Sequence, residues 1–435
     1  MSDELAIIGG PKAVTLEDDY VFSWPIITEE DEKAALEVLR AGTMSDTGIT
    51  KLFEEEFADW QGSAYTLGFS SGTASLLGAM YGVGVGVGDE VIAPSVTYWA
   101  AVLPCLSLGA TPVFADIQPD SLCIDPESFE EHISEHTKAV VVVHNYGHPA
   151  DMDEIAEIAH AHDIAVIEDV SHAHGGLYKG RKLGTIGDVG AMSLMSRKSF
   201  PVGEGGILAT DDREIYERAV AFGHYTRHGE DLERDELAQF GGLPFGGQKH
   251  RMHQISAAVG RVQLKHYDDR MAEIQEAMGY FWELLDDVSG ISIHHPEHED
   301  STMGGWYSPK GLYDAEKLDG LSVERFAEAV TAEGSTCLPG CNYALHTHPL
   351  LQNADVYGHG KPTRIANAHR DVRESEGDLP VAEGIQEHCF TIPWFKRYEP
   401  EVIEQHADAY RKVVEHRHEL LDTGGEPAAA TRVND

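Results

Sequence analysis

Between Tyr65 and Thr210 the chain alternates short apolar runs with longer stretches in which apolar residues recur at helical spacing. The short runs are AYTLGFS, EVIAPSV, TPVFADI, AVVVVHNYG, IAVIEDVS, GAMSLM and GILATD. Several of them are apolar throughout, which is typical of strands buried on both faces. Helical stretches such as SGTASLLGAMYG, YWAAVLPCLSLG and MDEIAEIAHAHD separate them. The pattern predicts an α/β fold with a mostly parallel sheet flanked by helices, whose ligands bind beyond the carboxyl ends of the strands.

The second half of the chain predicts a smaller domain. A long helical run without proline, ISAAVGRVQLKHYDDRMAEIQEAMGYFWELL, follows the sheet and leads out of it. Beyond it come fewer strands, more loops and a closing helix, EVIEQHADAYRKVVEHRHELL. We expect a large domain with an N-terminal arm over residues 1–265 and a smaller C-terminal α+β domain over residues 266–420. Residues 421–435 are predicted to form a disordered tail.

Composition changes this picture through charge. The 435 residues include 32 Lys and Arg against 74 Asp and Glu, which gives a formal net charge of −42 at pH 7. A surface of this sign repels phosphate backbones and anionic membranes, so we expect neither nucleic acid nor a membrane as a partner. The acidity fits either an over-acidic mesophilic protein or one adapted to a salt-rich cytoplasm. We favour the second interpretation, because counter-ions there screen the self-repulsion.

The termini and cysteines indicate where the protein works. No apolar run approaches the roughly 18 residues that span a bilayer. The opening MSDELAIIGG also lacks the basic flank and apolar stretch of a secretory signal, so we expect a cytoplasmic protein. The five cysteines are scattered and odd in number, which indicates free thiols. Cys337, Cys341, His346 and His348 have a spacing that zinc tolerates, but a Pro-Gly turn separates the cysteines, and we expect no metal site.

Two glycine-rich segments are candidates for binding phosphate. GVGVGVG, residues 82–88, follows a helical run and precedes a strand, which is the reverse of a dinucleotide-binding loop and predicts a simple connection. The strand AYTLGFS instead runs into Ser70–Ala74 and then into a helical pattern. A helix N-terminus there offers unpaired N–H groups, Gly72 allows close approach, and Ser71 or Thr73 can donate a hydroxyl. Plain N-capping by Ser71 or Thr73 explains the same residues equally well.

A carboxylate and a lysine stand at two further strand ends. The apolar strand IAVIEDVS ends with Asp169, where burial is costly unless a cation is near, and a protonated pyridine nitrogen would be such a cation. After the next strand, Lys198 precedes the glycine-rich GEGG. This is an unusual place for a solvated charge and indicates a lysine that forms a Schiff base. A lone lysine is nevertheless most often an ordinary surface residue.

The order of these features carries more weight than any one of them. A glycine-serine-threonine turn, an aromatic residue after a strand, Asp169, then Ser193 and Lys198 resemble the fold-type I enzymes that use pyridoxal 5′-phosphate (PLP). More narrowly, the chain resembles the DegT/DnrJ/EryC1/StrS family of sugar aminotransferases from about Leu5 to Val414. The blocks that carry the resemblance are SGTASL, GDEVIAPSVTYWA, PVFADI, VVHNYGHPADMDEI, IEDVSHAHGG, GDVGAMSLMSRKSF with GEGG soon after, RMHQISAAVGRVQL and DLPVAEGIQEHCFTIPWF.

The resemblance implies a role for each matching residue. Lys198 would hold PLP covalently and move a proton during catalysis, and Asp169 would pair with the pyridinium nitrogen. His172, where the family has glutamine or histidine, would contact the ring hydroxyl, and Tyr98 would stack on the ring face. The residues that would hold the phosphate are Gly72, Thr73 and Ser193.

Two positions depart from the family pattern. In GQKHRM, residues 247–252, Lys249 stands where the family usually has asparagine. The resemblance implies a homodimer in which this segment helps to bind the phosphate of the neighbouring subunit, and a lysine can still reach a phosphate as a point charge. Ser199 follows Lys198 where asparagine is usual. Retention of the lysine decides the class, because relatives that replace it with histidine are dehydratases.

The implied reaction is ping-pong transamination from glutamate or glutamine to a keto sugar, usually a nucleotide-linked one. The opening LAIIGGPKAV resembles the subgroup that aminates cyclitol ketones such as scyllo-inosose, so a cyclitol is the alternative acceptor. A PLP-dependent lyase or dehydratase is disfavoured because Lys198 is present. A non-catalytic protein with this fold is disfavoured because the chain has no visible basic DNA-binding segment.

The charge interpretation predicts a salt-dependent stability. If the acidic surface is adapted to salt, the unfolding temperature should rise clearly between dilute buffer and molar KCl, because screening weakens the self-repulsion of the folded chain. Differential scanning calorimetry in the two buffers measures this. Equal unfolding temperatures would show that the acidity has no such role.

Overall fold

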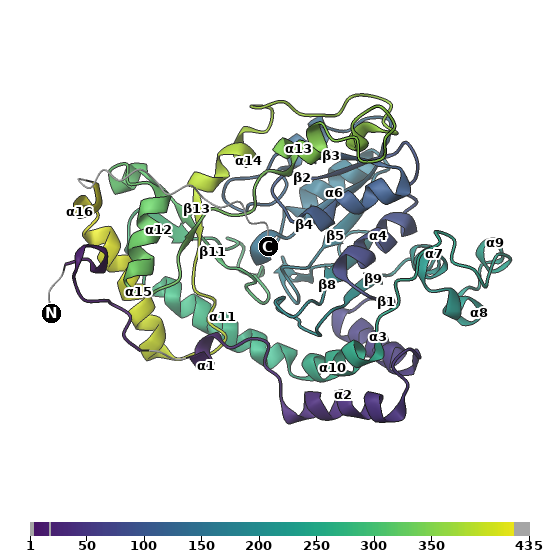
Figure 1. Ribbon diagram of the computed structural model, residues 1–435, viewed down its shortest axis with the longest axis horizontal. Helices are drawn as coiled ribbons and strands as arrows, with labels where there is room; N and C mark the ends of the chain where they lie inside the picture. Colours follow the sequence, from purple (N-terminus) through teal and green to yellow (C-terminus); the bar gives the residue numbers. More distant parts are fainter. Residues whose placement is uncertain (1–3, 17–18, 422–435) are drawn as a thin grey trace.

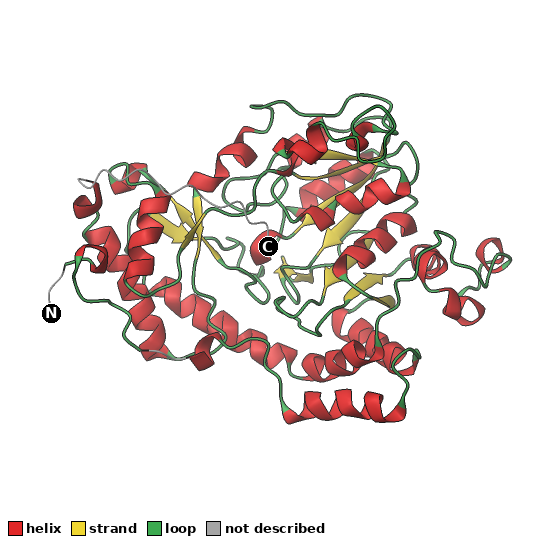
Figure 2. Ribbon diagram, in the orientation of Figure 1, coloured by secondary structure: helices red, strands yellow, loops and turns green. Residues whose placement is uncertain are grey.

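A seven-stranded sheet lies at the centre of the larger part of the computed structural model, which describes residues 4–16 and 19–421 (Figures 1 and 2). The strand order is β1-β9-β8-β5-β4-β2-β3. The strands are β1 (Tyr65–Phe69), β2 (Glu90–Pro94), β3 (Thr111–Ala115), β4 (Thr137–Val143), β5 (Ala165–Asp169), β8 (Val189–Ser193) and β9 (Gly206–Thr210). β9 is antiparallel to β1 and β8, and the other neighbours are parallel. The seven strands predicted in this region and the mostly parallel sheet are confirmed.

The continuous apolar runs follow from burial of the sheet on both faces. In β4, Val140 and Val142 belong to one hydrophobic cluster, while Val141 and Val143 belong to a second cluster on the opposite face. Successive side chains of a strand point to opposite faces, so a strand covered on both sides must be apolar at every position. The helices therefore cover both faces of this sheet, and its strand ends are left for polar chemistry.

The helices lie around the sheet and along its lower edge in Figure 1. Those longer than seven residues are α2 (Glu29–Ala41), α3 (Gly48–Gln61), α4 (Gly72–Gly82), α6 (Met152–Ala161), α7 (Arg213–Gly223), α10 (Gln254–Lys265), α11 (Tyr267–Glu283), α12 (Val323–Ala332) and α15 (Pro400–Glu415). The shorter ones are α1 (Asp19–Phe22), α5 (Pro126–Glu131), α8 (His228–Asp231), α9 (Asp235–Ala238), α13 (Pro349–Gln352), α14 (Pro380–Gly384) and α16 (His418–Leu421). Within the described part of the chain, no helix is long and apolar enough to cross a membrane.

Two helical predictions need correction. YWAAVLPCLSLG forms two short 3₁₀ helices, Trp99–Ala101 and Leu103–Leu108, because Pro104 cannot donate a backbone hydrogen bond within a continuous helix. The long run after the sheet is two helices, α10 and α11, which meet at His266, where the backbone leaves the helical conformation. GVGVGVG connects α4 to β2, as its position predicts, and Gly84 and Gly88 take positive φ angles there.

The second part of the molecule surrounds a small antiparallel sheet in the order β10-β11-β13-β12. Its strands are β10 (Ile291–Ile293), β11 (Lys310–Tyr313), β12 (Leu338–Pro339) and β13 (Cys389–Thr391). α12, α15 and the C-terminal end of α11 pack beside it (Figure 1). A two-stranded ribbon, β6 (Leu177–Tyr178) and β7 (Arg181–Lys182), completes the strands of the described chain.

Contacts cross the predicted boundary near residue 265 in both directions. The N-terminal arm lies on the smaller part, where the Glu333 carboxylate accepts hydrogen bonds from the Ala6 and Ala13 N–H groups. In return, the segment between β12 and β13 folds back onto the large sheet, and Arg364 donates to the Pro112 carbonyl at 3.0 Å. The domain limits 1–265 and 266–420 remain predictions, and the predicted tail lies outside the described residues except for Leu421.

Candidate active site

A cavity of about 390 Å³ opens at the carboxyl ends of the parallel strands. It brings together almost all the residues that the sequence selects, namely Gly72, Thr73, Tyr98, Asp169, His172, Ser193 and Lys198. Lys249 is the exception, because it is exposed and does not line the cavity of its own protomer. The convergence follows from topology, since parallel strands end at the same edge of a sheet.

The amino end of α4 forms one wall. Ser71 is the N-cap, and its hydroxyl accepts from the Ala74 N–H at 3.1 Å. The first helical residue must be glycine, because a Cβ on Gly72 would lie 2.4 Å from the Cβ of Ser193. This close approach places the helix N-terminus directly against the end of β8. Ser71 therefore caps the helix, and the helix N-terminus faces the cavity, where the binding of a phosphate stays a prediction.

Asp169, the last residue of β5, is 6% exposed. Burial raises the pKa of its carboxyl, while hydrogen bonds from Ser171 oppose the rise, including one from the Ser171 N–H at 3.0 Å. Within the described residues it forms no ion pair, so a buried carboxylate stands at the cavity without a neutralising partner. A cationic group on a ligand would supply that partner.

Lys198 is 9% exposed and forms no ion pair at contact distance with a carboxylate among the described residues. Burial lowers the pKa of its amine to about 8, although Asp169 acts in the opposite direction. Its Nζ lies 4.0 Å from the centroid of the Tyr307 ring. A lysine with a lowered pKa is neutral more often near physiological pH and is then able to act as a nucleophile or base.

His172 presents a fixed tautomer to the cavity. Its Nδ1 accepts from the Tyr146 N–H at 3.2 Å, so the proton of the neutral ring is on Nε2. Burial, reinforced by the nearby Lys198, holds the pKa of His172 well below its usual value. The neutral ring can therefore donate one hydrogen bond to a ligand oxygen without adding a positive charge.

Two further side chains near Lys198 come from positions that the sequence does not select. Tyr307 stands between Trp306 and Ser308, which have φ angles of 52° and 50°, a left-handed conformation that is costly for such residues. Trp24, from the N-terminal arm, donates its indole N–H to the Lys198 carbonyl at 2.9 Å. No local sequence pattern predicts either residue at the site, because each belongs to a segment that is remote from Lys198 in the sequence.

A buried histidine links Ser199, which stands where asparagine is usual, to the end of β8. His174 contacts the Ser199 hydroxyl through Nδ1 at 3.0 Å and the Ser193 carbonyl through Nε2 at 2.9 Å. Burial lowers the pKa of His174 to about 3, so it bridges the end of β8 and Ser199 as a neutral ring. Tyr267 donates to the His174 carbonyl at 3.0 Å and encloses the same network.

The cysteine–histidine group considered for zinc is used otherwise. His346 contacts Ser95 and Glu383, and His348 caps α13 by accepting from the Leu350 N–H at 3.1 Å. Cys337 is buried in the hydrophobic core. All five cysteines are free, and within residues 4–16 and 19–421 no group of three or more His, Cys, Asp or Glu could hold a metal ion.

The observed groups fit PLP. The N-terminus of α4 suits its phosphate. The carboxylate of Asp169 suits its protonated ring nitrogen, and the buried amine of Lys198 suits its aldehyde. The Thr97 hydroxyl lines the same cavity, is buried and has no hydrogen-bond partner among the described residues, as expected of a site shaped for a polar ligand.

Comparison with known proteins gives a consistent result. The sequence model of the DegT/DnrJ/EryC1/StrS aminotransferase family matches residues 25–411. L-glutamine:scyllo-inosose aminotransferase of Streptomyces griseus is 31% identical to this chain, and the match covers 97% of this chain and 100% of the relative. GDP-perosamine synthase of Escherichia coli O157:H7 is 32% identical over 65% of this chain and 75% of its own.

Solved structures extend the similarity to three dimensions. An aminotransferase from Psychrobacter cryohalolentis superposes with a TM-score of 0.79 at 28% identity, over 91% of this chain and 99% of its own. DesV of S. venezuelae gives a TM-score of 0.72 at 28% identity, over 89% of this chain and 95% of its own. The fold is therefore that of the fold-type I PLP-dependent transferases, as the resemblance implies.

The lowered Lys198 pKa predicts how PLP attaches to the apoprotein. Only the neutral amine reacts with an aldehyde, so the attachment rate should rise with pH and level off above a pH of about 8. Asp169→Asn removes the carboxylate that holds the Lys198 pKa up, so its rate profile should move to lower pH. Stopped-flow absorbance after mixing apoprotein with PLP measures both profiles. Glu204→Gln, which alters another carboxylate that lines the cavity, is the matched control and should leave the profile in place. An Asp169→Asn profile identical to that of the wild type would contradict this assignment.

Proposed function

The chain belongs to the DegT/DnrJ/EryC1/StrS aminotransferase family, and from this premise we propose that it transfers an amino group from glutamate or glutamine to the ketone of a polyhydroxylated ring. The ring is a keto sugar, nucleotide-linked or free, or a cyclitol. The observation that carries the proposal is the meeting of Lys198, Asp169 and the α4 N-terminus in one cavity.

Each residue of the chain has a defined task in this proposal. Gly72, Thr73 and Ser193 bind the phosphate, and Tyr98 supports one ring face. Asp169 holds the ring nitrogen protonated, and His172 donates Nε2–H to the ring hydroxyl. PLP would supply the electron sink for the carbon that gains or loses the amine. When it is not bonded to the cofactor, the neutral Nζ of Lys198 would move a proton between that carbon and the aldehyde carbon of PLP.

The charges that line the cavity and the names of the relatives narrow the range of ketones that could be the acceptor. Lys198 is the only Lys or Arg among the residues that line the cavity within the described chain, and Glu204 lines it too. A diphosphate would need further cations, which this protomer does not place there. A cyclitol ketone needs none, and the relative matched over 97% of this chain is named for scyllo-inosose. A nucleotide-linked keto sugar remains a candidate because GDP-perosamine synthase is also a relative.

A homodimer is part of the proposal. Lys249 is exposed and lies outside its own cavity, so it can serve a phosphate only in a neighbouring subunit. The preceding segment, with α8 and α9, projects from the right side of the molecule in Figure 1 and exposes 62% of Phe240 and 76% of Leu243. Such apolar side chains suit burial against a second copy. Five free thiols also suit the reducing cytoplasm that we propose as its compartment.

Isotope transfer tests the proposed reaction directly. Holoenzyme in high-salt buffer is incubated with glutamine or glutamate carrying labelled nitrogen and, in separate reactions, with scyllo-inosose and a nucleotide-linked 4-keto hexose. We expect mass spectrometry to find labelled nitrogen in one aminated ring, with an equal amount of the donor's 2-oxo acid. The Lys198→Ala variant is the matched control and should give neither product.

Each alternative gives a different result. Loss of water from the sugar without amine gain would favour a dehydratase. Labelled amine on neither ketone, together with no 2-oxo acid from either donor, would contradict the aminotransferase proposal for these substrates and favour a non-catalytic protein.

A further inference from the structure

A remote segment of the chain is built onto the strand end that carries Thr97 and Tyr98. Ala344 pairs with Val96 in an isolated antiparallel bridge, and the Leu345 N–H donates to the Ser95 carbonyl at 2.8 Å. Ser95 follows β2 directly and precedes the two residues that enter the cofactor cavity. The segment therefore lies against the back of the active-site wall, about 250 residues away in sequence.

One side-chain relay joins the two segments. The Ser95 hydroxyl lies 2.6 Å from Nδ1 of His346, and Nε2 of His346 lies 3.2 Å from Oε1 of Glu383. A carboxylate can only accept, so Nε2 carries the proton and Nδ1 accepts the Ser95 hydroxyl. Ser95 is fully buried and His346 is 1% exposed. Two buried polar groups thus satisfy each other, and a change at either one leaves the other unpaired.

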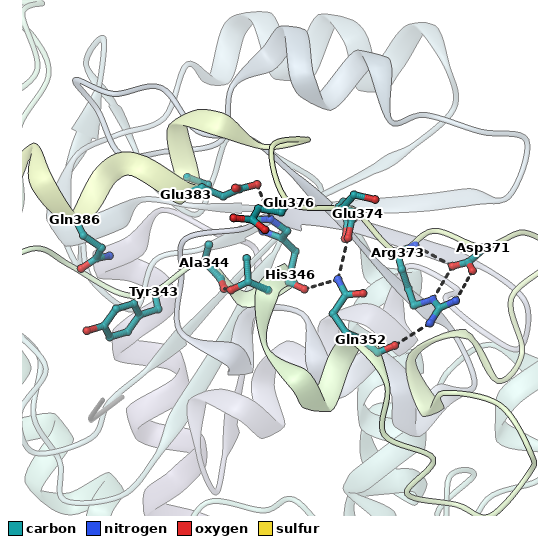
Figure 3. A pocket seen from close by; sticks show the side chains of 13 residues that line it. Tyr343, Ala344, His346, Gln352, Asp371, Arg373, Glu374, Glu376, Glu383 and Gln386 are labelled. Carbon is teal, nitrogen blue, oxygen red and sulfur yellow. Dashed lines mark hydrogen bonds and ion pairs between the residues drawn. The ribbon is translucent and has the colours of Figure 1, made fainter. Parts of the chain in front are cut away.

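The backbone of His346 is also held in place by a hydrogen bond from Gln352 (Figure 3). Gln352 donates to the His346 carbonyl at 2.7 Å and to the Glu374 carbonyl at 2.9 Å. The Glu374 carboxylate is held by two hydrogen bonds of 2.7 Å from the buried Arg364. His346 is therefore mounted on a rigid, ion-paired support and not on a freely moving loop.

The serine–histidine–glutamate order invites a comparison with hydrolases, but the surroundings do not support one. Ser95 is 0% exposed, so no substrate carbonyl can reach its hydroxyl. A polar cavity of about 750 Å³ adjoins His346 and Glu383. Two charged pairs in its wall form within the chain, Asp371 with Arg373 (Figure 3) and Glu374 with Arg364. Ser95 does not line this cavity, so the serine end of the relay lies beside β2 and not in the cavity.

We propose that His346 is a positioning residue for the aminotransferase reaction, which fixes Ser95 and thereby holds Thr97 and Tyr98 against the cofactor. The same segment supplies Asn342 to the cavity, and the Asn342 N–H and side-chain oxygen both lie 2.9 Å from the Tyr146 hydroxyl. Tyr98 is 38% exposed, and among the described residues its ring stacks only with the adjacent Trp99, so its orientation depends on the backbone that carries it. The inference rests on the proposed function only in taking PLP as the cofactor.

The test separates the two ring nitrogens. Asparagine at position 346 places its oxygen where Nδ1 lies and can still accept from Ser95, whereas glutamine reaches Glu383 but not Ser95. We expect His346→Gln and Ser95→Ala to weaken PLP binding by up to about tenfold, the equivalent of one buried hydrogen bond. Both should also reduce the visible circular dichroism of bound PLP, which reports on the asymmetric contact with Tyr98. His346→Asn should restore both values toward those of the wild type.

His348→Gln is the matched control, because His348 lies in the same segment, only caps α13 and should leave both readouts unchanged. Thermal unfolding of each variant separates positioning from stability. If His346→Gln does not fold, Ser95→Ala carries the test, since it removes a single hydroxyl. Folded variants with wild-type PLP affinity and circular dichroism would overturn the proposal, even if they unfold at a lower temperature. Failure of the wild type to bind PLP would instead overturn the proposed function along with it.

Discussion

The active site depends on keeping Asp169, at the end of β5, and Lys198, in the loop after the neighbouring β8, out of water. Burial acts on the two groups in opposite directions, since it raises the pKa of the carboxyl and lowers that of the amine. Neither charge has an ion-pair partner within the described residues. The free-energy cost of burying each charge falls when a ligand brings a protonated ring nitrogen to Asp169 and a carbonyl carbon to Lys198. The site is therefore electrostatically incomplete by itself and complementary to PLP.

The surrounding structure holds this arrangement from several directions. α4 approaches β8 closely because Gly72 has no side chain, and His174 joins the ends of β5 and β8 as a neutral bridge. Tyr307 lines the cavity from the smaller part of the molecule, and Trp24, from the N-terminal arm, donates to the backbone carbonyl of Lys198. These contacts give the amine of Lys198 one location and one environment, which a reaction at a single carbon requires.

The sequence predicts those parts of the site that depend on local order. Asp169 ends β5 and Lys198 lies in the loop that follows the end of β8 at Ser193, and topology brings these two strand ends together. Tyr307, Trp24 and His346 could not be predicted in this way, because only the packing of remote segments places them near the cavity. The continuous helix expected around Pro104 does not form for a local reason, since the missing N–H of the proline outweighs the helical spacing of the apolar residues. The position of Lys249 outside its own cavity agrees with a role in a second subunit, a role that remains a prediction.

The most direct test of the central claim asks which lysine holds PLP. Lys396 is a demanding comparison, because burial lowers its pKa to about 7, below that of Lys198, yet its Nζ contacts only Trp394. Holoenzyme is reduced with borohydride, digested and analysed by mass spectrometry, alongside Lys198→Arg and Lys396→Arg. The account predicts the cofactor adduct on the peptide containing Lys198, unchanged in Lys396→Arg and absent in Lys198→Arg. An adduct that persists in Lys198→Arg, or one found on Lys396 in the wild type, would contradict it.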